Sequence, residues 1–226
     1  MCSRYSLTTP AEAVRQLFQL PHIDTFPPRA NIAPTQPVGI VCLDANGERS
    51  FELVRWGLIP GWVKDPAKLS TLINARAETV LEKPSFRGSM RHRRCIVPAS
   101  GFYEWVGPPR AKRPFLIQSR DGGCMGFAGI WDHWLGADGS EIDTMAILTV
   151  AANTVVSAVH DRMPAILARN QFDAWLDVRG VEAKAAAHLL NPAPDAILEL
   201  FEVSTRVNNV GNEGLDLQER VNTTLL

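Results

Sequence analysis

The strongest constraint on the fold is a β-hairpin signal, in which two strand-like segments flank the pair Asn46-Gly47. Residues 38–43 and 51–56 are rich in the β-branched, aromatic and aliphatic side chains that strands prefer. Asn-Gly is the preferred pair for a tight hairpin turn, because both turn residues need a positive φ. The pattern therefore predicts that the core begins with antiparallel strands.

Further short segments have strand composition, and glycine-containing turns at 121–123 and 138–139 separate some of them. We predict strands at residues 95–97, 102–105, 115–118, 125–130, 145–150 and 201–203. We predict helices at about 75–82, 153–159, 170–177 and 181–190. No alternation of strand and helix runs through the chain, which argues against a parallel βαβ fold. We expect a single α+β domain over residues 1–226, mainly antiparallel sheet closed into a barrel-like core, with several short helices.

One more helix has a clear start signal near the N-terminus. Thr9 supplies a capping hydroxyl, Pro10 suits the first helical position, and Glu12 suits the first turn. Residues 24–37 are rich in proline and polar side chains and predict a long ordered loop.

Composition narrows the class of protein. With 226 residues, 46% of them hydrophobic and 21% charged, the chain has the balance of a globular protein with a sizeable core. No apolar run approaches the roughly 20 residues of a membrane span, and the N-terminus lacks the pattern of a secretory signal. We therefore expect a cytoplasmic protein without membrane contact.

The cysteines are scattered and have no ligand-like spacing. Cys42, Cys95 and Cys124 have the character of core thiols, and neither they nor Cys2 belong to a CxxC or Cys/His pattern. We expect no structural zinc, no disulfide framework, no metal and no cofactor.

Charge is distributed unevenly along the chain. Residues 1–120 carry 17 Lys/Arg against 9 Asp/Glu, and residues 121–226 carry 6 against 15, within a net charge of −1. The densest basic stretch is 87–94, with four arginines, and Arg110, Lys112 and Arg113 form a second cluster. Such a surface suits phosphate binding, although a solvated loop has the same composition.

Cys2 is the most reactive feature. If Met1 is removed, Cys2 carries a free α-amine with a pKa of about 7.7–8.0 and a thiol with a pKa of about 8.5 on adjacent carbons. The amine condenses with an aldehyde to a Schiff base, and the thiol then closes a five-membered thiazolidine on the same carbon. The alternative is that position 2 simply holds a small residue.

Three other clusters place polar groups near predicted element ends. Asn74 and Arg76 lie at the entrance of the predicted 75–82 helix, where free N–H groups favour anions, although Asn74 alone also fits a helix cap. By strand alternation Glu104 shares a face with Phe102, so it faces either inward, where burial raises its pKa, or solvent. His160 follows the predicted 153–159 helix and is either a proton-transfer group or a helix-ending residue.

Taken in order along the chain, these clusters resemble the motif series of the SRAP (SOS response-associated peptidase) family. The resemblance extends to about residue 209, and its motifs are Cys2-Ser3-Arg4-Tyr5, Asn31-Ile-Ala-Pro34, Arg55-Trp56-Gly57 with Trp62, Asn74-Ala-Arg76-Ala-Glu78-Thr79, Arg94-Cys95 to Glu104-Trp105, and His160-Asp161-Arg162-Met-Pro164.

The resemblance implies a sensor and shield for abasic sites in single-stranded DNA during replication and the DNA damage response. The catalytic residues it implies are Cys2, which forms a thiazolidine DNA–protein cross-link, and Asn74, Glu104 and His160. In that scheme Glu104 shuttles protons in lyase-like Schiff-base chemistry, His160 assists at the sugar hydroxyl, and Asn74 orients Cys2 or the sugar. We expect an exposed Cys2 beside the Glu104 and His160 side chains.

The same resemblance implies a DNA-binding set. It consists of Arg4, Pro34, Trp62, Arg76 and Arg162, with the arginines on phosphates and Trp62 as a wedge or stacking platform. Ser3 and Val63 depart from the residues frequent at these positions, and Val63 removes a second tryptophan beside Trp62. The expected partner is single-stranded DNA with abasic sites, including junctions with duplex DNA, bound by a monomer that associates with the nucleoid.

Two other functions fit some of these residues. One is a cysteine peptidase or N-terminal-nucleophile hydrolase in which His160 activates Cys2, with autocatalytic removal of Met1 as a related event. The other is a non-covalent reader of modified or junction DNA that uses the arginine and tryptophan surface. Loss of Cys2 separates them, since a reader keeps its function.

Overall fold

The computed structural model describes residues 2–221. A closed ring of five strands forms its centre, in the order β10–β4–β3–β6–β9 and back to β10. The β10–β4 pair is parallel and the other four pairs are antiparallel, so the barrel is mixed. The ring comprises β3 (Pro37–Leu43), β4 (Arg49–Trp56), β6 (Arg94–Ala99), β9 (Met125–Leu135) and β10 (Glu141–Ala151).

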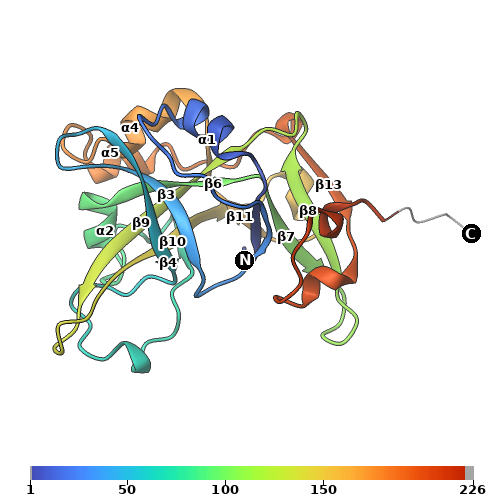
Figure 1. Cartoon of the computed structure of the whole chain (residues 1–226), viewed down its shortest axis with the longest axis horizontal. Coiled ribbons are helices and arrows are strands. Elements are labelled where there is room, and N and C mark those ends of the chain that lie inside the picture. Colours follow the sequence, from blue (N-terminus) through green and yellow to red (C-terminus); the bar gives the residue numbers. More distant parts are fainter. Residues whose placement is uncertain (1, 222–226) are drawn as a thin grey trace, which may run out of the picture.

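A second sheet of five strands lies beside the barrel, at the right in Figure 1. Its order is β13–β8–β7–β1–β2, and all four pairs are antiparallel. Its strands are β1 (Tyr5–Leu7), β2 (Arg29–Ile32), β7 (Gly101–Val106), β8 (Arg113–Ser119) and β13 (Leu198–Glu202). Short strands extend the barrel sheet: β5 (Asn74–Arg76) pairs with β10, β11 (Arg162–Pro164) with β10, and β12 (Ile166–Leu167) with β9.

The expected fold class is confirmed, and so is the hairpin, because β3 and β4 pair from Pro37↔Arg55 to Leu43↔Arg49 around the Asn46-Gly47 turn. Gly47 has a positive φ of +86° but Asn46 does not, so the connection is a five-residue loop at 44–48, in which the Gly47 amide donates to the Asp44 carbonyl at 3.1 Å, and not a two-residue turn. All six further predicted strands exist, each within one residue or extended at its ends.

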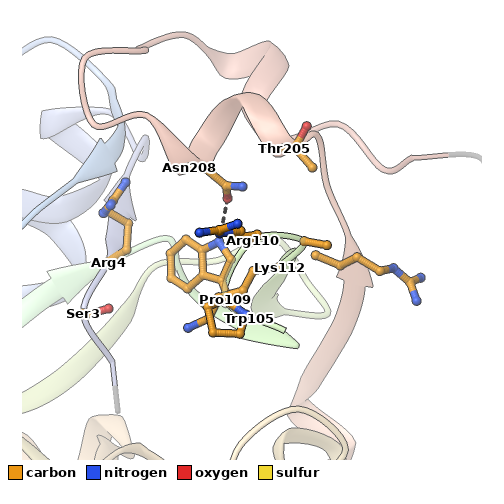
Figure 2. Close-up of a pocket in the computed structure, with 10 residues that line it drawn as sticks. Ser3, Arg4, Trp105, Pro109, Arg110, Lys112, Thr205 and Asn208 are labelled. Carbon is orange, nitrogen blue, oxygen red and sulfur yellow. Dashed lines mark hydrogen bonds between the residues drawn. The ribbon is translucent and has the colours of Figure 1, made fainter. Parts of the chain in front are cut away.

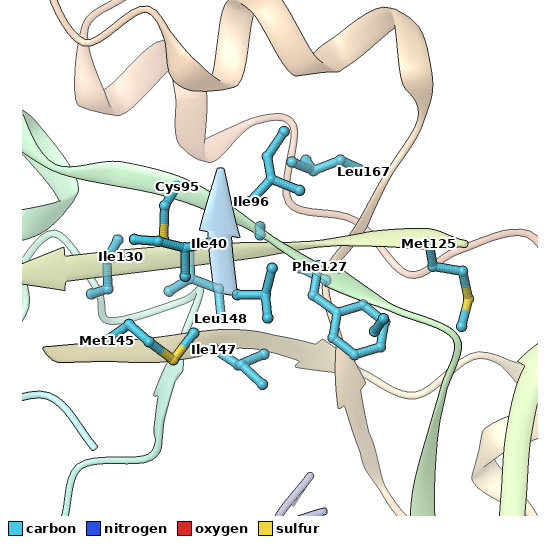
Figure 3. Packing of buried hydrophobic residues seen from close by; sticks show 14 of the residues in the cluster. Ile40, Cys95, Ile96, Met125, Phe127, Ile130, Met145, Ile147, Leu148 and Leu167 are labelled. Atoms are coloured by element: carbon cyan, nitrogen blue, oxygen red, sulfur yellow. The ribbon is translucent and has the colours of Figure 1, made fainter. Parts of the chain in front are cut away.

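Aliphatic and aromatic side chains of the barrel strands form the core (Figure 3). Ile40, Ile96, Phe127, Ile147 and Leu148 are each fully buried. Burial of a large aliphatic or aromatic side chain stabilises the fold by roughly 1.5–3 kcal/mol each, so this interior holds the strands that carry the polar residues in place.

The helices are short, and α1, α4 and α5 gather at the top of Figure 1. They are α1 (Ala11–Phe18), α2 (Arg87–His92), α3 (Thr154–Ser157), α4 (Phe172–Leu176) and α5 (Ala183–Ala187), with 3-10 turns η1 (Pro66–Lys68), η2 (Arg169–Gln171), η3 (Asp195–Ile197), η4 (Thr205–Asn208) and η5 (Leu215–Gln218). None of the helices described is long and apolar enough to cross a membrane.

Three local predictions are wrong. The predicted 75–82 helix is instead β5 followed by turns, because Asn74–Arg76 pairs in parallel with Ile147–Thr149 of β10. The predicted 24–37 loop contains β2, which pairs with β1. Thr9 does not cap α1, since its hydroxyl lies 2.8 Å from the Ser100 hydroxyl and Pro10 occupies the capping position without a side-chain hydrogen bond.

Candidate functional site

Cys2 lies directly before β1, buried between the two sheets. Its side chain has no exposed surface, so the expected exposure of this residue is wrong for the structure. The thiol Sγ lies 3.7 Å from the carbonyl oxygen of Arg4, to which it donates. Met1, whose removal the thiazolidine scheme requires, lies outside the described residues. The thiol is therefore held in a fixed position near the start of the second sheet.

Asn74 contacts Cys2 directly, from the other sheet. Its Nδ2 donates to the Cys2 carbonyl oxygen at 2.7 Å. Asn74 occupies this position because β5 pairs with the middle of β10, with Asn74 opposite Ile147. It is a strand residue and not a helix cap, so the predicted anion site at a helix entrance is wrong. The Asn74 Oδ1 is buried and has no hydrogen-bond partner among the described residues.

Glu104 faces inward from β7, as strand alternation with Phe102 allows. Its strand pairs with β1 at Tyr5↔Phe102, which brings the carboxylate toward the N-terminal segment. Only 4% of Glu104 is exposed, and this burial raises the pKa of its carboxyl group, while His160 opposes the rise electrostatically. Burial also raises the pKa of the Cys2 thiol, and the negative charge of Glu104 raises it further. The carboxyl group is thus electrostatically coupled to both Cys2 and His160.

His160 follows α3, and its backbone N–H donates to Val156 at 2.9 Å. Its Nδ1 lies 2.9 Å both from the backbone nitrogen of Arg162 and from Oδ1 of Asp161. A backbone amide can only donate, so in the neutral ring Nδ1 is the acceptor and Nε2 carries the proton. The Asp161 side chain is 86% exposed, so its contact with Nδ1 contributes little to holding the imidazole in place. The backbone of β11 therefore sets the tautomer and orientation of His160.

The three predicted phosphate-binding arginines differ in how many protein groups their side chains already bind. Arg4 Nη1 donates to Asn31 Oδ1 at 2.6 Å and to the Val207 carbonyl at 3.0 Å. Arg162 donates to both carboxylate oxygens of Glu78. Only Arg76 of the three is exposed without a hydrogen bond or ion pair in the part of the chain that is described. Arg4 and Arg162 are partly structural, which residue type and spacing did not reveal.

Trp62 and helix α2 form a groove of about 440 Å³, which we call the α2 groove. Trp62 is 64% exposed, and Arg87, Arg91 and His92 line the groove with it. Pro34 lies elsewhere, half-buried in the turn between β2 and β3. An exposed indole beside cationic side chains suits stacking and phosphate contact.

Arg94 does not belong to this basic surface, contrary to the sequence prediction for 87–94. It is 1% exposed and donates to the carbonyl oxygens of Met90, Trp175, Asp177 and Val181 at 2.6–3.2 Å. Arg93 pairs with Asp132 at 3.2 Å. Only the first two arginines of the stretch, on α2, face the groove.

Two structural residues of this region had no role in the sequence analysis. Asn31 is fully buried, and besides holding Arg4 it donates through Nδ2 to carbonyl oxygens at 209 and 212, at 3.0 and 2.9 Å. Glu78 anchors Arg162. Both residues lie inside motifs of the family series, so their positions could be singled out from the sequence. Their hydrogen-bond partners come from distant segments, which spacing along the chain cannot identify.

The comparisons with known proteins agree with one another. A family model described as SOS response associated peptidase (SRAP) matches residues 1–210. The abasic site processing protein YoqW of Bacillus subtilis is 35% identical over 226 residues, which cover 97% of this chain and 99% of that protein. The abasic site processing protein HMCES of Gallus gallus is 35% identical over 192 residues, covering 74% of this chain and 56% of that protein.

Solved structures share the fold. A crystal structure of a protein from Bacteroides thetaiotaomicron has a TM-score of 0.82 and 27% identity, covering 97% of this chain and 99% of that one. One from Bordetella bronchiseptica has a TM-score of 0.77 and 28% identity, covering 90% and 100%. On the family match and these relatives, the chain belongs to the SRAP family.

Proposed function

We propose that this protein processes abasic sites in single-stranded DNA by forming a covalent thiazolidine cross-link through Cys2, once Met1 has been removed. The observation that carries the proposal is the convergence at Cys2 of two polar residues from distant segments, Asn74 and Glu104, with His160 coupled to Glu104. Asn74 holds the Cys2 carbonyl at 2.7 Å, and Glu104 acts electrostatically on both the thiol and His160. The relatives named abasic site processing proteins supply the substrate class.

The chemistry needs a group that can both give and take a proton. The ring-opened abasic sugar presents an aldehyde at C1′, and the Cys2 amine adds to it to form a carbinolamine. A carboxyl group with a raised pKa, as at Glu104, protonates the carbinolamine hydroxyl, which leaves as water to give the Schiff base. The thiol sulfur then adds to the same carbon, and its proton returns to the Glu104 carboxylate. The net result is one thiazolidine and one water, with Glu104 regenerated.

The other polar residues have supporting roles in this scheme. The Nε2–H of His160 suits proton transfer at the sugar hydroxyl that is released when the ring opens. Asn74 fixes the Cys2 backbone, so that its amine and thiol approach the sugar from one side. Arg76 and the α2 groove with Trp62 supply salt-sensitive phosphate contact and stacking along the strand.

A peptidase role receives less support from the same site. A cysteine peptidase needs a thiolate, and such thiols have a lowered pKa beside a cationic imidazole. Here burial and the Glu104 charge both raise the pKa of the Cys2 thiol. Thiazolidine closure tolerates a neutral thiol, because the amine reacts first and the neighbouring carboxylate then accepts the thiol proton.

The test is incubation of the purified protein with single-stranded DNA that carries one abasic site. We expect an adduct that survives denaturation, with a mass equal to protein plus DNA less one water and without Met1. Cys2→Ala should give no such adduct, while Cys42→Ala, a buried thiol in the barrel, serves as the matched control. An unchanged yield with Cys2→Ala would end the proposal, and retained function without any adduct would favour a non-covalent reader.

A further inference from the structure

A second basic groove, which we call the β7–β8 groove, lies beside β7 and β8 at the right of Figure 1, whereas α2, which carries the first basic groove, lies at the left. Figure 2 shows the residues that line it. It has a volume of about 730 Å³. Its walls are the N-terminal segment, the connection between β7 and β8, and the 3-10 turn η4, and the residues that line it are Ser3, Arg4, Trp105, Pro109, Arg110, Ala111, Lys112, Arg113, Thr205 and Asn208.

The groove is cationic. Four Lys or Arg side chains line it, and none of the described lining residues is acidic. Arg113 is neutralised, because its guanidinium donates to the Glu202 carboxylate. Arg110 and Lys112 are exposed and have no ion pair in the described part of the chain. Two uncompensated positive charges on one short connection favour an anionic occupant.

The connection that carries these charges has a fixed shape. Gly107 has a φ of +110°, and a Cβ there would lie 2.9 Å from the Ala111 carbonyl oxygen, so glycine permits this close approach. The Ala111 amide donates to the Pro108 carbonyl at 2.9 Å. The turn therefore presents Arg110 and Lys112 at defined positions.

Trp105 forms the apolar wall. Its indole Nε1 donates to Asn208 Oδ1 at 2.6 Å, which anchors the ring to η4 (Figure 2). The Arg4 guanidinium lies 5.6 Å from the ring centroid. An aromatic wall flanked by cations is the combination that binds single-stranded nucleic acid, in which phosphates meet the cations and bases meet the ring.

We infer that the β7–β8 groove holds the nucleotides that flank the abasic site on one side, with their phosphates on Arg110 and Lys112. This inference rests on the proposed function. Ser3 and Arg4 line the groove and directly follow Cys2 in the chain, so the groove adjoins the Cys2 segment and lies where a strand leaving Cys2 on that side would pass. Because the groove lies on one side of Cys2, it contributes to the binding of nucleotides on only one side of the abasic site, either the 5′ or the 3′ side.

The experiment uses two abasic oligonucleotides, one with five nucleotides only on the 5′ side of the site and one with five only on the 3′ side. Equilibrium binding is measured with full-length protein carrying Cys2→Ala, so that no covalent step intervenes. To this background we add Arg110→Ala with Lys112→Ala. The matched control is Arg120→Ala with Arg169→Ala, which also removes two exposed positive charges but lies outside both grooves.

We expect the Arg110/Lys112 variant to bind one of the two oligonucleotides about tenfold more weakly, with the log–log salt slope reduced by about 1.4, the value for two single-strand phosphate contacts. The affinity of this variant for the other oligonucleotide should stay within twofold of that of the Cys2→Ala protein. The same holds for the affinity of the control variant for each of the two oligonucleotides. Unchanged binding of both oligonucleotides, or equal weakening of both, would overturn the inference. Failure of the proposed function shows separately, as absence of the adduct from protein with an intact Cys2.

Discussion

The Arg162 guanidinium binds the Glu78 carboxylate in a bidentate pair, with Nη1 2.5 Å from Oε1 and Nη2 2.9 Å from Oε2. Nη2 also donates to the Thr149 carbonyl at 2.6 Å. Because the backbone N–H of the same Arg162 holds His160 Nδ1, the ion pair anchors the segment that orients the imidazole. The β5 turn is thereby tied to β11 across the edge of the barrel sheet.

Replacement of Glu78 by Ala should lower the free energy of unfolding by about 1–2 kcal/mol, because the Arg162 side chain, 12% exposed, keeps its desolvation without its anion. Urea denaturation at neutral pH measures this change. Glu82→Ala, which removes an exposed carboxylate nearby in sequence, should stay within about 0.5 kcal/mol of the wild type. Equal effects of the two substitutions would show that the pair does not stabilise the fold.

Asn74→Ala should slow adduct formation about tenfold, since loss of a hydrogen bond that positions Cys2 is expected to raise the barrier by about 1.4 kcal/mol. The measurement is a single-turnover time course with an abasic oligonucleotide in excess. Asn74→Asp should be at least as slow, because a carboxylate cannot donate to the Cys2 carbonyl. Asn191→Ala is the control and should react at the wild-type rate, because among residues 2–221 the Asn191 side-chain amide bonds only to the His188 carbonyl. A wild-type rate for Asn74→Ala would remove this contact from the mechanism.

Glu104→Gln should change how stability depends on pH. The folded-state pKa of Glu104 is raised by burial above its unfolded value, so the protonated carboxyl favours the folded state. That contribution is fully present below the unfolded pKa, about 4.3, and is lost as the pH rises through the folded pKa. The glutamine variant does not titrate, so it should gain stability relative to wild type as the pH rises above the unfolded pKa of about 4.3.

Urea denaturation of both proteins at one-unit pH intervals tests this sign, and a pH-independent difference would contradict burial as the cause. The same variant should form the adduct more slowly at neutral pH, because an amide cannot transfer the proton. A stability gain together with a rate loss distinguishes a proton-transfer group from a residue that only supports the fold.

Arg94→Met should destabilise the protein by about 3 kcal/mol or more, because four carbonyl oxygens, two in buried and two in partly buried hydrogen bonds, lose a charged donor. Arg91→Met, on the exposed face of α2, should change the free energy of unfolding by less than about 0.5 kcal/mol. For DNA binding we expect the opposite ranking: Arg91→Met should have the larger effect of the two substitutions and should reduce the salt dependence of binding. Equal stability of the two variants would contradict the separation of these arginines into core and surface.

Elements whose signals are local could be predicted from the amino-acid sequence. The Asn46-Gly47 pair marks the connection between two strand-like segments, so β3 and β4 follow from neighbouring residues alone. Alternation along β7 likewise places Glu104 on the face of Phe102, and the order of motifs along the chain predicts the family.

Features that depend on partners far away in the sequence became visible only in the folded chain. Asn74–Arg76 is a strand because β10 offers it a pairing edge, which outweighs the local helix signal. Arg91 and Arg94 have the same local composition around them, yet one faces a groove and the other is surrounded by carbonyl groups. Burial of Cys2, and its approach to Asn74 and Glu104, arise where the two sheets meet. The physical reason is that burial and pairing are properties of segments brought together by folding, and spacing along the chain does not encode them.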